Sequence, residues 1–353
     1  MKKKIAIVGA TGLVGRKTVE MLKEYELNDN DIYLYANKNS VGKVFDINNK
    51  KIYVQELSKG NMQGKKFDFA LFCTPESVSK DYVRALAKLG TRVIDFSSLY
   101  RKEYPIIVPE INMDMAKGNI FCNPNCSTTI SLMALFNIHK LFGLKSVEYT
   151  SYQSLSGAGQ MALLDQKESE QSKLRKLDFV IDNNILPYIG NIDEHGFSRE
   201  ENKMIYETKK ILNDNTIKVT ATCVRVNVDI CHSISINFKT RKNVMLQDIK
   251  NVLKSTKNVE YVGDDFSKLQ PRFVKNKKDV YVGRLRKTEL GKNSFSIFVV
   301  GDNLRKGASQ NGVQILKELI KRSEQWYLKV FVLHLSHHSK TIKVLTLLHL
   351  KNW

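Results

Sequence analysis

One cysteine in this chain stands in a setting that favours nucleophilic chemistry. Cys126 follows the turn-forming residues Asn123-Pro124-Asn125 and precedes a run, residues 130–136, that is apolar nearly all round. Such a run predicts a buried helix that begins at Cys126. Because the positive end of a helix dipole stabilises a thiolate, we expect the pKa of the Cys126 thiol to be lowered.

A glycine-rich turn near the start of the chain has the spacing of a dinucleotide site. The apolar residues 5–8 stop at Gly9, and Gly9-Ala10-Thr11-Gly12-Leu13-Val14-Gly15 places a glycine at every third position. Glycines let the backbone approach a pyrophosphate, which the free N–H groups of the following helix stabilise. Any tight strand-to-helix turn needs glycine, but the predicted strand before it and helix after it favour a dinucleotide.

The residues after the second predicted strand bear on which nicotinamide cofactor would bind. Residues 35–40 contain no Asp or Glu to hold a ribose 2′-hydroxyl, as NAD enzymes require. Lys38, Ser40 and Lys43 would instead suit a 2′-phosphate. The pattern favours NADP, although a plain solvated loop has the same composition.

A cysteine nucleophile and a nicotinamide cofactor in one chain point to aldehyde oxidation through a thioester, or to the reverse reduction of an acyl group. The sequence resembles the aspartate-semialdehyde dehydrogenase family, with matches in order over residues 3–322. The matching segments are 9–15, 94–98, 108–112, 123–129, 153–159, 200–204, 225–233 and 302–307. The resemblance implies reductive dephosphorylation of 4-phospho-L-aspartate to the semialdehyde, in the biosynthesis of lysine and diaminopimelate, threonine and methionine.

The resemblance also implies a role for each site residue. Cys126 would form the thioester, His232 would be the general acid/base, and Gln153 would orient the acyl group. Arg225 would pair with the substrate carboxylate and Glu200 with its ammonium group. The remaining substrate contacts would be Lys203 and Arg101, which would bind phosphate, and Asn125. The cofactor would contact Gly9, Thr11, Gly12, Leu13, Val14, Gly15, Asn39, Ser40, Ser156, Gly157 and Asn311.

Four positions depart from the family's usual pattern. Asn39 stands where the family usually has Arg, Phe96 where it has Asn, Asn227 where it has Pro, and Cys231 where it has Gly. The first departure weakens the prediction of NADP. A side chain at Cys231, next to His232, could disturb the placement of the imidazole.

Two kinds of sheet must position these residues. Short apolar runs alternate with helical patterns in the first part of the chain and predict a parallel sheet, whereas longer β-prone runs from about residue 146 favour antiparallel strands. We therefore predict an α/β fold with a Rossmann-like dinucleotide-binding domain and a mixed α+β catalytic and dimerisation domain. The first would comprise residues 1–127 plus a closing helix within 305–322, and the second residues 128–304.

Composition sets further limits on partners and location. Lys and Arg number 56 against 36 Asp and Glu, a net charge of +20, but the basic residues are scattered without aromatic neighbours. We therefore expect no nucleic-acid partner. We also expect no membrane span, since no apolar stretch reaches about 18 residues. The five cysteines are odd in number and lack the spacing of a zinc site or a disulfide framework, which indicates reduced thiols and a cytoplasmic location rather than secretion. The resemblance implies a homodimer or a dimer of dimers.

Two alternatives and one unassigned segment stay open at this point. N-acetyl-γ-glutamyl-phosphate reductase shares the chemistry with a longer, acylated substrate, and a catalytically silent basic binding protein would have the same charge. Residues 323–353 contain no Gly, Pro or Asp and remain unassigned. His334, His337 and His338 could share a helical face there, but no nearby Cys or carboxylate accompanies them, so we predict no metal site.

Overall fold

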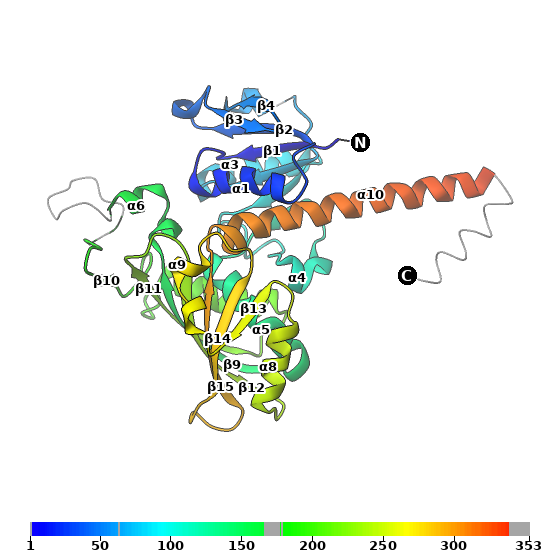
Figure 1. The fold of residues 1–353 in the computed structure, drawn as a ribbon. Coiled ribbons are helices and arrows are strands. Elements are labelled where there is room, and N and C mark those ends of the chain that lie inside the picture. Colours follow the sequence, from blue (N-terminus) through cyan, green and yellow to red (C-terminus); the bar gives the residue numbers. More distant parts are fainter. Residues whose placement is uncertain (1, 63, 166–176, 178, 339–353) are drawn as a thin grey trace.

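The protein folds around two sheets of different character, as a computed structural model shows for residues 2–62, 64–165, 177 and 179–338, with side chains described as far as residue 325 (Figure 1). The first sheet has six parallel strands in the order β5-β2-β1-β6-β7-β8. Its strands are β1 (Lys4–Val8), β2 (Asp31–Ala36), β5 (Gln55–Glu56), β6 (Phe69–Phe72), β7 (Arg92–Asp95) and β8 (Ile120–Cys122). A hairpin, β3 (Val44–Ile47) and β4 (Lys50–Tyr53), lies beside it.

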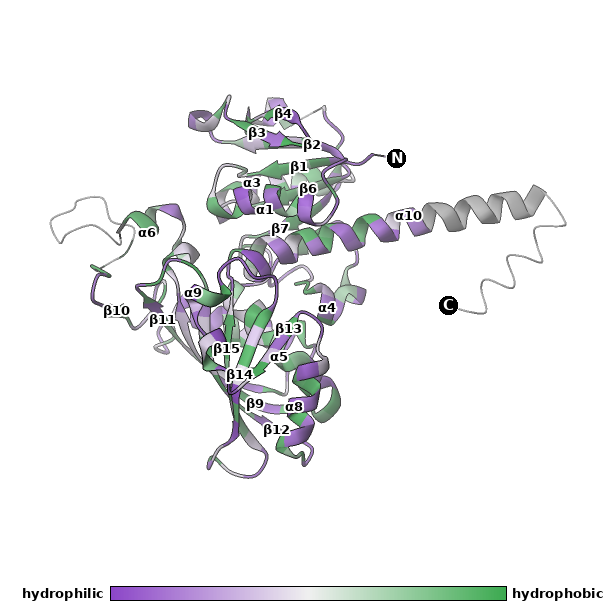
Figure 2. Ribbon diagram, viewed as in Figure 1, coloured by the Kyte–Doolittle hydropathy of each residue, from purple (hydrophilic) through white to green (hydrophobic). Residues whose placement is uncertain are grey.

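Helices connect and cover the parallel strands. They are α1 (Leu13–Glu24), α2 (Lys59–Met62), α3 (Glu76–Lys88) and α4 (Pro109–Asn112), with short 3₁₀ turns at Lys38–Ser40 and Met113–Met115. Strands β1, β6 and β7 are hydrophobic over most of their length because both faces of a parallel sheet are buried (Figure 2). The predicted Rossmann-like α/β architecture is therefore confirmed.

The second sheet has seven strands in the order β10-β11-β9-β12-β15-β14-β13, of which two pairs, β9 with β11 and β13 with β14, are parallel. Its strands are β9 (Leu144–Gln153), β10 (Ile185–Leu186), β11 (Lys218–Val226), β12 (His232–Thr240), β13 (Val259–Gly263), β14 (Val280–Lys287) and β15 (Ser294–Gly301). Strands β11 and β12 are consecutive in the chain, but β9 lies between them in the sheet.

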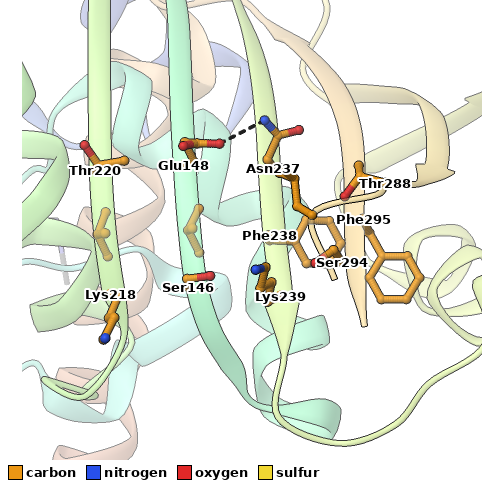
Figure 3. A pocket seen from close by; sticks show the side chains of 13 residues that line it. Ser146, Glu148, Lys218, Thr220, Asn237, Phe238, Lys239, Thr288, Ser294 and Phe295 are labelled. Carbon is orange, nitrogen blue, oxygen red and sulfur yellow. Dashed lines mark hydrogen bonds between the residues drawn. The ribbon is translucent and has the colours of Figure 1, made fainter. Parts of the chain in front are cut away.

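The two faces of the second sheet differ. Around it lie α5 (Cys126–Phe142), α6 (Gln160–Asp165), α7 (Arg199–Ile211), α8 (Leu246–Ser255) and α9 (Pro271–Val274), with 3₁₀ turns at Leu155–Ala158 and Phe266–Lys268. The contacts of α5, α7 and α8 with its strands bury one face. On its strands a hollow of about 360 Å³ is lined by polar and apolar side chains, among them Glu148 and Asn237, which form a hydrogen bond of 3.1 Å (Figure 3).

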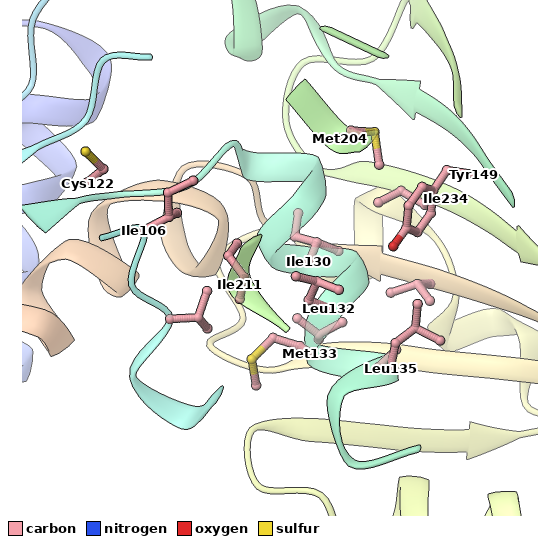
Figure 4. Packing of buried hydrophobic residues seen from close by; sticks show 14 of the residues in the cluster. Ile106, Cys122, Ile130, Leu132, Met133, Leu135, Tyr149, Met204, Ile211 and Ile234 are labelled. Carbon is pink, nitrogen blue, oxygen red and sulfur yellow. The ribbon is translucent and has the colours of Figure 1, made fainter. Parts of the chain in front are cut away.

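Helix α5 carries the core that joins the two halves of the molecule. Its side chains pack against Tyr149 and Ile234 of the second sheet and Met204 of α7, while Ile106 and Cys122 extend the same cluster toward the first sheet (Figure 4). The sequence prediction of a buried helix beginning at Cys126 is confirmed.

The last helix differs from its prediction. After a π-helical turn at Arg305–Ser309, α10 (Gln310–His338) packs on α1 and β7 and then continues, away from both sheets (Figure 1). The prediction that this helix ends near residue 322 is wrong, because the following residues contain no Gly or Pro to stop it. The side chains of His334, His337 and His338, and residues 339–353, lie outside the part that the structure describes.

Candidate active site

Cys126 and His232 meet at the junction of α5 and β12. The Cys126 Sγ lies 3.1 Å from the His232 Nε2. Asn125 caps α5, since its side chain accepts a hydrogen bond from the Thr128 N–H at 3.0 Å and so fixes the turn that presents the thiol. Gly307 packs beneath it, where a Cβ atom would lie only 2.9 Å from the Cys126 Cβ. The thiol is therefore held from both sides while staying partly accessible.

Burial dominates the electrostatics of this pair. It raises the pKa of the Cys126 thiol to about 11, with the Glu200 carboxylate adding to the effect and Arg225 opposing it. The expectation of a lowered pKa is wrong, because loss of solvation outweighs the helix dipole. Burial and the Arg225 cation lower the pKa of His232 to about 3. Both side chains are therefore neutral near pH 7 before substrate arrives.

The hydrogen bonds of His232 define its tautomer. The Ser154 backbone N–H donates to Nδ1 at 3.1 Å, so the proton of the neutral ring is on Nε2, which faces the sulfur. The Ser154 hydroxyl donates to the Asn303 Oδ1 at 3.1 Å, and the Cys231 N–H donates to the same oxygen at 2.9 Å. Sequence reasoning missed Ser154 and Asn303 as supports, although both lie inside matching segments.

Cys231 has an unusual backbone for a residue with a side chain. Its φ of 82° lies in the left-handed region that favours glycine. The side chain is buried against Leu269, Val274 and Val300 and does not enter the space between Cys126 and His232. The departure from glycine is therefore accommodated by backbone strain, and not by displacement of the imidazole.

Three charged side chains surround the thiol. The Glu200 Oε1 accepts from Asn125 Nδ2 at 2.6 Å, and Oε2 accepts from the Lys203 Nζ at 3.1 Å. Burial alone would raise the pKa of Glu200, but Lys203 and the Asn125 hydrogen bond lower it to about 2. Arg225 is buried too and donates from Nη1 to the Ser154 carbonyl at 2.7 Å. Glu200 and Lys203 therefore form a largely buried ion pair beside the thiol.

Arg101 is bound to partners within the protein. Its Nη1 donates to the Glu207 Oε1 at 2.8 Å and its Nη2 to the Phe96 carbonyl at 2.9 Å, in a fully buried ion pair. The other Glu207 oxygen accepts from the Asn125 N–H at 2.7 Å. Glu207 was missed, but its spacing from Glu200 on α7, two helical turns, is a signal that could have found it.

The 3₁₀ turn after β9 forms the adjoining wall. A Cβ atom on Gly157 would lie 3.0 Å from the Arg225 Nη1 and 3.2 Å from the His232 Cε1, so glycine permits the close approach. Ser156 is buried, and its hydroxyl accepts from the Asn303 Nδ2 at 3.0 Å. Gln153 is also buried, with Nε2 donating to the Ser151 hydroxyl at 3.1 Å.

The glycine-rich turn has the geometry of a dinucleotide cradle. Gly9 has φ of 80°, and a Cβ atom there would lie 2.4 Å from the Cys73 carbonyl oxygen. A Cβ atom on Gly15 would lie 2.0 Å from the Gly9 oxygen. Helix α1 begins after Gly12 without a side-chain cap, so its first N–H groups are open to an anion. These residues fit the phosphates of a dinucleotide.

The other predicted cofactor residues fall into two groups. The Thr11 hydroxyl donates to the Ser40 hydroxyl at 3.1 Å, and Asn39 is exposed beside them. Asn311 is fully buried, however, and its Nδ2 donates to Asn123 Oδ1 and to a backbone carbonyl. These hydrogen bonds anchor the start of α10 beside the turn that precedes Cys126, and the cofactor contact of Asn311 stays a prediction.

Comparison with known proteins agrees with this arrangement. Residues 4–118 match the semialdehyde dehydrogenase NAD binding domain, and residues 135–306 match the semialdehyde dehydrogenase dimerisation domain. Aspartate-semialdehyde dehydrogenases of Aquifex aeolicus and Bacillus subtilis are 40% and 36% identical, each over 90% of this chain and 98% and 97% of their own lengths.

A solved structure is similar over the same range. Aspartate semialdehyde dehydrogenase II from Vibrio cholerae, complexed with ASA, superposes with a TM-score of 0.86 at 32% identity, covering 91% of this chain and 99% of its own. Both halves of the chain, with the reaction centre between them, are thus matched. The chain belongs to the aspartate-semialdehyde dehydrogenase family.

Proposed function

We propose that this protein is an NADP-dependent aspartate-semialdehyde dehydrogenase that reductively dephosphorylates 4-phospho-L-aspartate to L-aspartate 4-semialdehyde. The observation that carries the proposal is the 3.1 Å approach of the Cys126 sulfur to His232, with Arg225, Glu200 and Lys203 around it. A partly accessible thiol among groups of both charges suits a small substrate that carries a carboxylate, an ammonium group and a phosphate. The product serves the biosynthesis of lysine, threonine and methionine.

In this mechanism Cys126 makes and breaks the covalent bond. Its sulfur attacks the acyl carbon and forms a thioester. The bond between this carbon and the phosphate oxygen breaks, and phosphate leaves with the proton of the thiol. The Nε2–H of His232 donates to the group that gains negative charge in each step. A nicotinamide, when bound, supplies the hydride that reduces the acyl carbon, after which the sulfur departs and the semialdehyde is released.

The charged side chains would select the substrate by its two ends. Arg225 would bind the α-carboxylate with its planar guanidinium, and Glu200 would bind the ammonium group. Lys203 would attract the phosphate. An N-acetylated substrate carries no ammonium charge for Glu200 to bind and would place an acetyl group against this buried carboxylate, which disfavours the N-acetyl-γ-glutamyl-phosphate reductase alternative.

The cofactor preference rests on the glycine-rich turn and the residues after β2. Within residues 35–40 no carboxylate is available for a ribose 2′-hydroxyl, while Ser40 lies in contact with Thr11. These features support NADP over NAD. The absence of Arg at position 39 keeps the expected preference modest.

The second sheet supports assembly into a homodimer or a dimer of dimers. It belongs to the segment that matches a dimerisation domain, and its hollow lies on strands β9, β11, β12 and β15. Glu148 and Tyr152 occupy alternate positions of β9 and therefore point to the same side of the sheet, where Tyr152 is 38% exposed. A second copy would cover this surface.

The five cysteines are free thiols, which supports a reducing, cytoplasmic setting. Among the helices described, none is long and apolar enough to cross a membrane. In the same residues no group of three or more His, Cys, Asp or Glu side chains could hold a metal ion.

A spectrophotometric assay tests the function. Purified protein is mixed with NADP, phosphate and either L-aspartate 4-semialdehyde or N-acetyl-L-glutamate 5-semialdehyde, and NADPH formation is followed. We expect turnover with the first substrate to exceed turnover with the second by about 100-fold or more, because only the first has an ammonium group that pairs with the buried Glu200 carboxylate. No phosphate-dependent turnover with either substrate, together with salt-sensitive RNA binding, would instead support the silent binding protein.

A further inference from the structure

The protein lacks a cation where its resemblance predicts one for a 2′-phosphate. Position 39 is Asn, and the neighbouring basic residues Lys38 and Lys43 are exposed side chains in the segment between β2 and β3. Lysine ammonium groups on flexible stems hold a phosphate less specifically than a planar guanidinium. A site built from Ser40 and these lysines alone would discriminate poorly between NADP and NAD.

A guanidinium from another element lies at the same edge of the sheet. Arg16, in the first turns of α1, donates from Nε to the Thr11 carbonyl at 2.9 Å. The hydroxyl of the same Thr11 is 3.1 Å from the Ser40 hydroxyl. Arg16 is therefore anchored to the residue that touches the predicted 2′-phosphate loop.

A second contact helps to orient the Arg16 guanidinium. The Arg16 Cζ lies 5.7 Å from the centre of the Phe45 ring, which restricts the guanidinium from a second side. Among the ion pairs of the described residues, Arg16 takes part in none, whereas the adjacent Lys17 pairs with Glu20 at 2.6 Å. An exposed guanidinium with its Nη groups available, fixed at Nε, is suited to bidentate binding of phosphate.

We propose that Arg16 supplies the cation that Asn39 does not, and that with Ser40 it determines the preference for a cofactor that carries a 2′-phosphate. The inference rests on the proposed use of NADP and names the residue responsible for it. In this arrangement specificity comes from the helix after the glycine-rich turn and not from the loop after β2.

Calorimetric titration of the full-length protein tests the assignment without relying on turnover. The probes are 2′,5′-ADP, which carries the 2′-phosphate, and 5′-AMP, which lacks it. We expect Arg16→Gln to weaken 2′,5′-ADP binding roughly 10- to 100-fold, as loss of charge-assisted hydrogen bonds implies, with 5′-AMP binding unchanged. The matched control, Lys17→Gln, removes a neighbouring cation on the same helix and should change neither affinity.

A second variant tests whether the two positions are interchangeable. In the Arg16→Gln background, Asn39→Arg should restore binding of 2′,5′-ADP. Equal affinities of Arg16→Gln and wild-type protein for 2′,5′-ADP, with the wild type still preferring it to 5′-AMP, would overturn the role of Arg16 alone. A wild-type protein that does not distinguish the two probes would overturn both this inference and the proposed NADP preference.

Discussion

The reaction centre and the outer edge of the cofactor site follow different rules of construction. Around Cys126 the charged groups Glu200 and Arg101 are buried, and each has an ion-pair partner, Lys203 and Glu207 respectively. Around Asn39 the polar side chains are exposed. An unpaired charge that is buried lowers the stability of the fold, so the reaction centre tolerates few substitutions. At the outer edge of the cofactor site, water replaces the hydrogen bonds of a side chain that is lost. The departure at Asn39 therefore leaves no strain, while the departure at Cys231 places a non-glycine residue at positive φ.

The largest effect is expected at the nucleophile itself. Cys126→Ser should lower kcat by about 1,000-fold or more, because a hydroxyl lacks the nucleophilicity of the sulfur near neutral pH. Circular dichroism should show an unchanged fold. Cys122→Ala, which alters a buried thiol outside the site, is the control and should keep most of the activity. If both variants lose activity to the same extent, the nucleophile is wrongly assigned.

The raised pKa of the Cys126 thiol predicts how its alkylation rate depends on pH. Its thiolate fraction is small near pH 7 and grows as pH rises toward about 11, so iodoacetamide alkylation should accelerate roughly tenfold per pH unit between about pH 7 and 10. The groups that face the thiol are Glu200, Arg225, Lys203 and the neutral His232. A rate that is flat from about pH 5 to 8 would indicate a thiolate–imidazolium pair and contradict a neutral His232 protonated only on Nε2.

A buried and an exposed ion pair offer a direct contrast in stability. Glu207→Gln leaves the buried Arg101 charge uncompensated and should lower the free energy of unfolding by about 3–5 kcal/mol. Glu76→Gln removes the partner of exposed Arg199 and should cost about 1 kcal/mol or less. Urea denaturation of both variants measures the difference. Equal losses would mean that burial does not distinguish the two regions.

The strain at Cys231 predicts a reversal of the usual order of two small residues. In regular secondary structure a protein with glycine is ordinarily less stable than the same protein with alanine. At φ of 82° we expect the reverse, with the free energy of unfolding of Cys231→Gly about 1 kcal/mol above that of Cys231→Ala. Both variants lose the same buried sulfur, so they differ only in the Cβ atom, whose clash with the backbone at positive φ is the source of the strain. Thermal unfolding of the two proteins provides the measurement, and a more stable alanine variant would argue against strain at this position.

The sequence predicted the parts of the site that short motifs carry. The turn before Cys126, the glycine turn at residues 9–15 and the two sheets follow from local patterns of glycine, proline and apolar residues. The pairing of Arg101 with Glu207 joins residues 106 positions apart and depends on how α7 packs, which no local pattern encodes. The same holds for the thiol pKa, because burial is a property of the whole fold and here exceeds the local helix dipole.

Trapping of the acyl-enzyme tests the central claim most directly. The protein is mixed with L-aspartate 4-semialdehyde and NADP without phosphate, quenched in acid, digested and analysed by mass spectrometry. The account predicts one NADPH formed per active site and an aspartyl thioester on the peptide that contains Cys126, which later phosphate addition removes. NADPH formation with no acylated peptide, or with the acyl group on another residue, would contradict it.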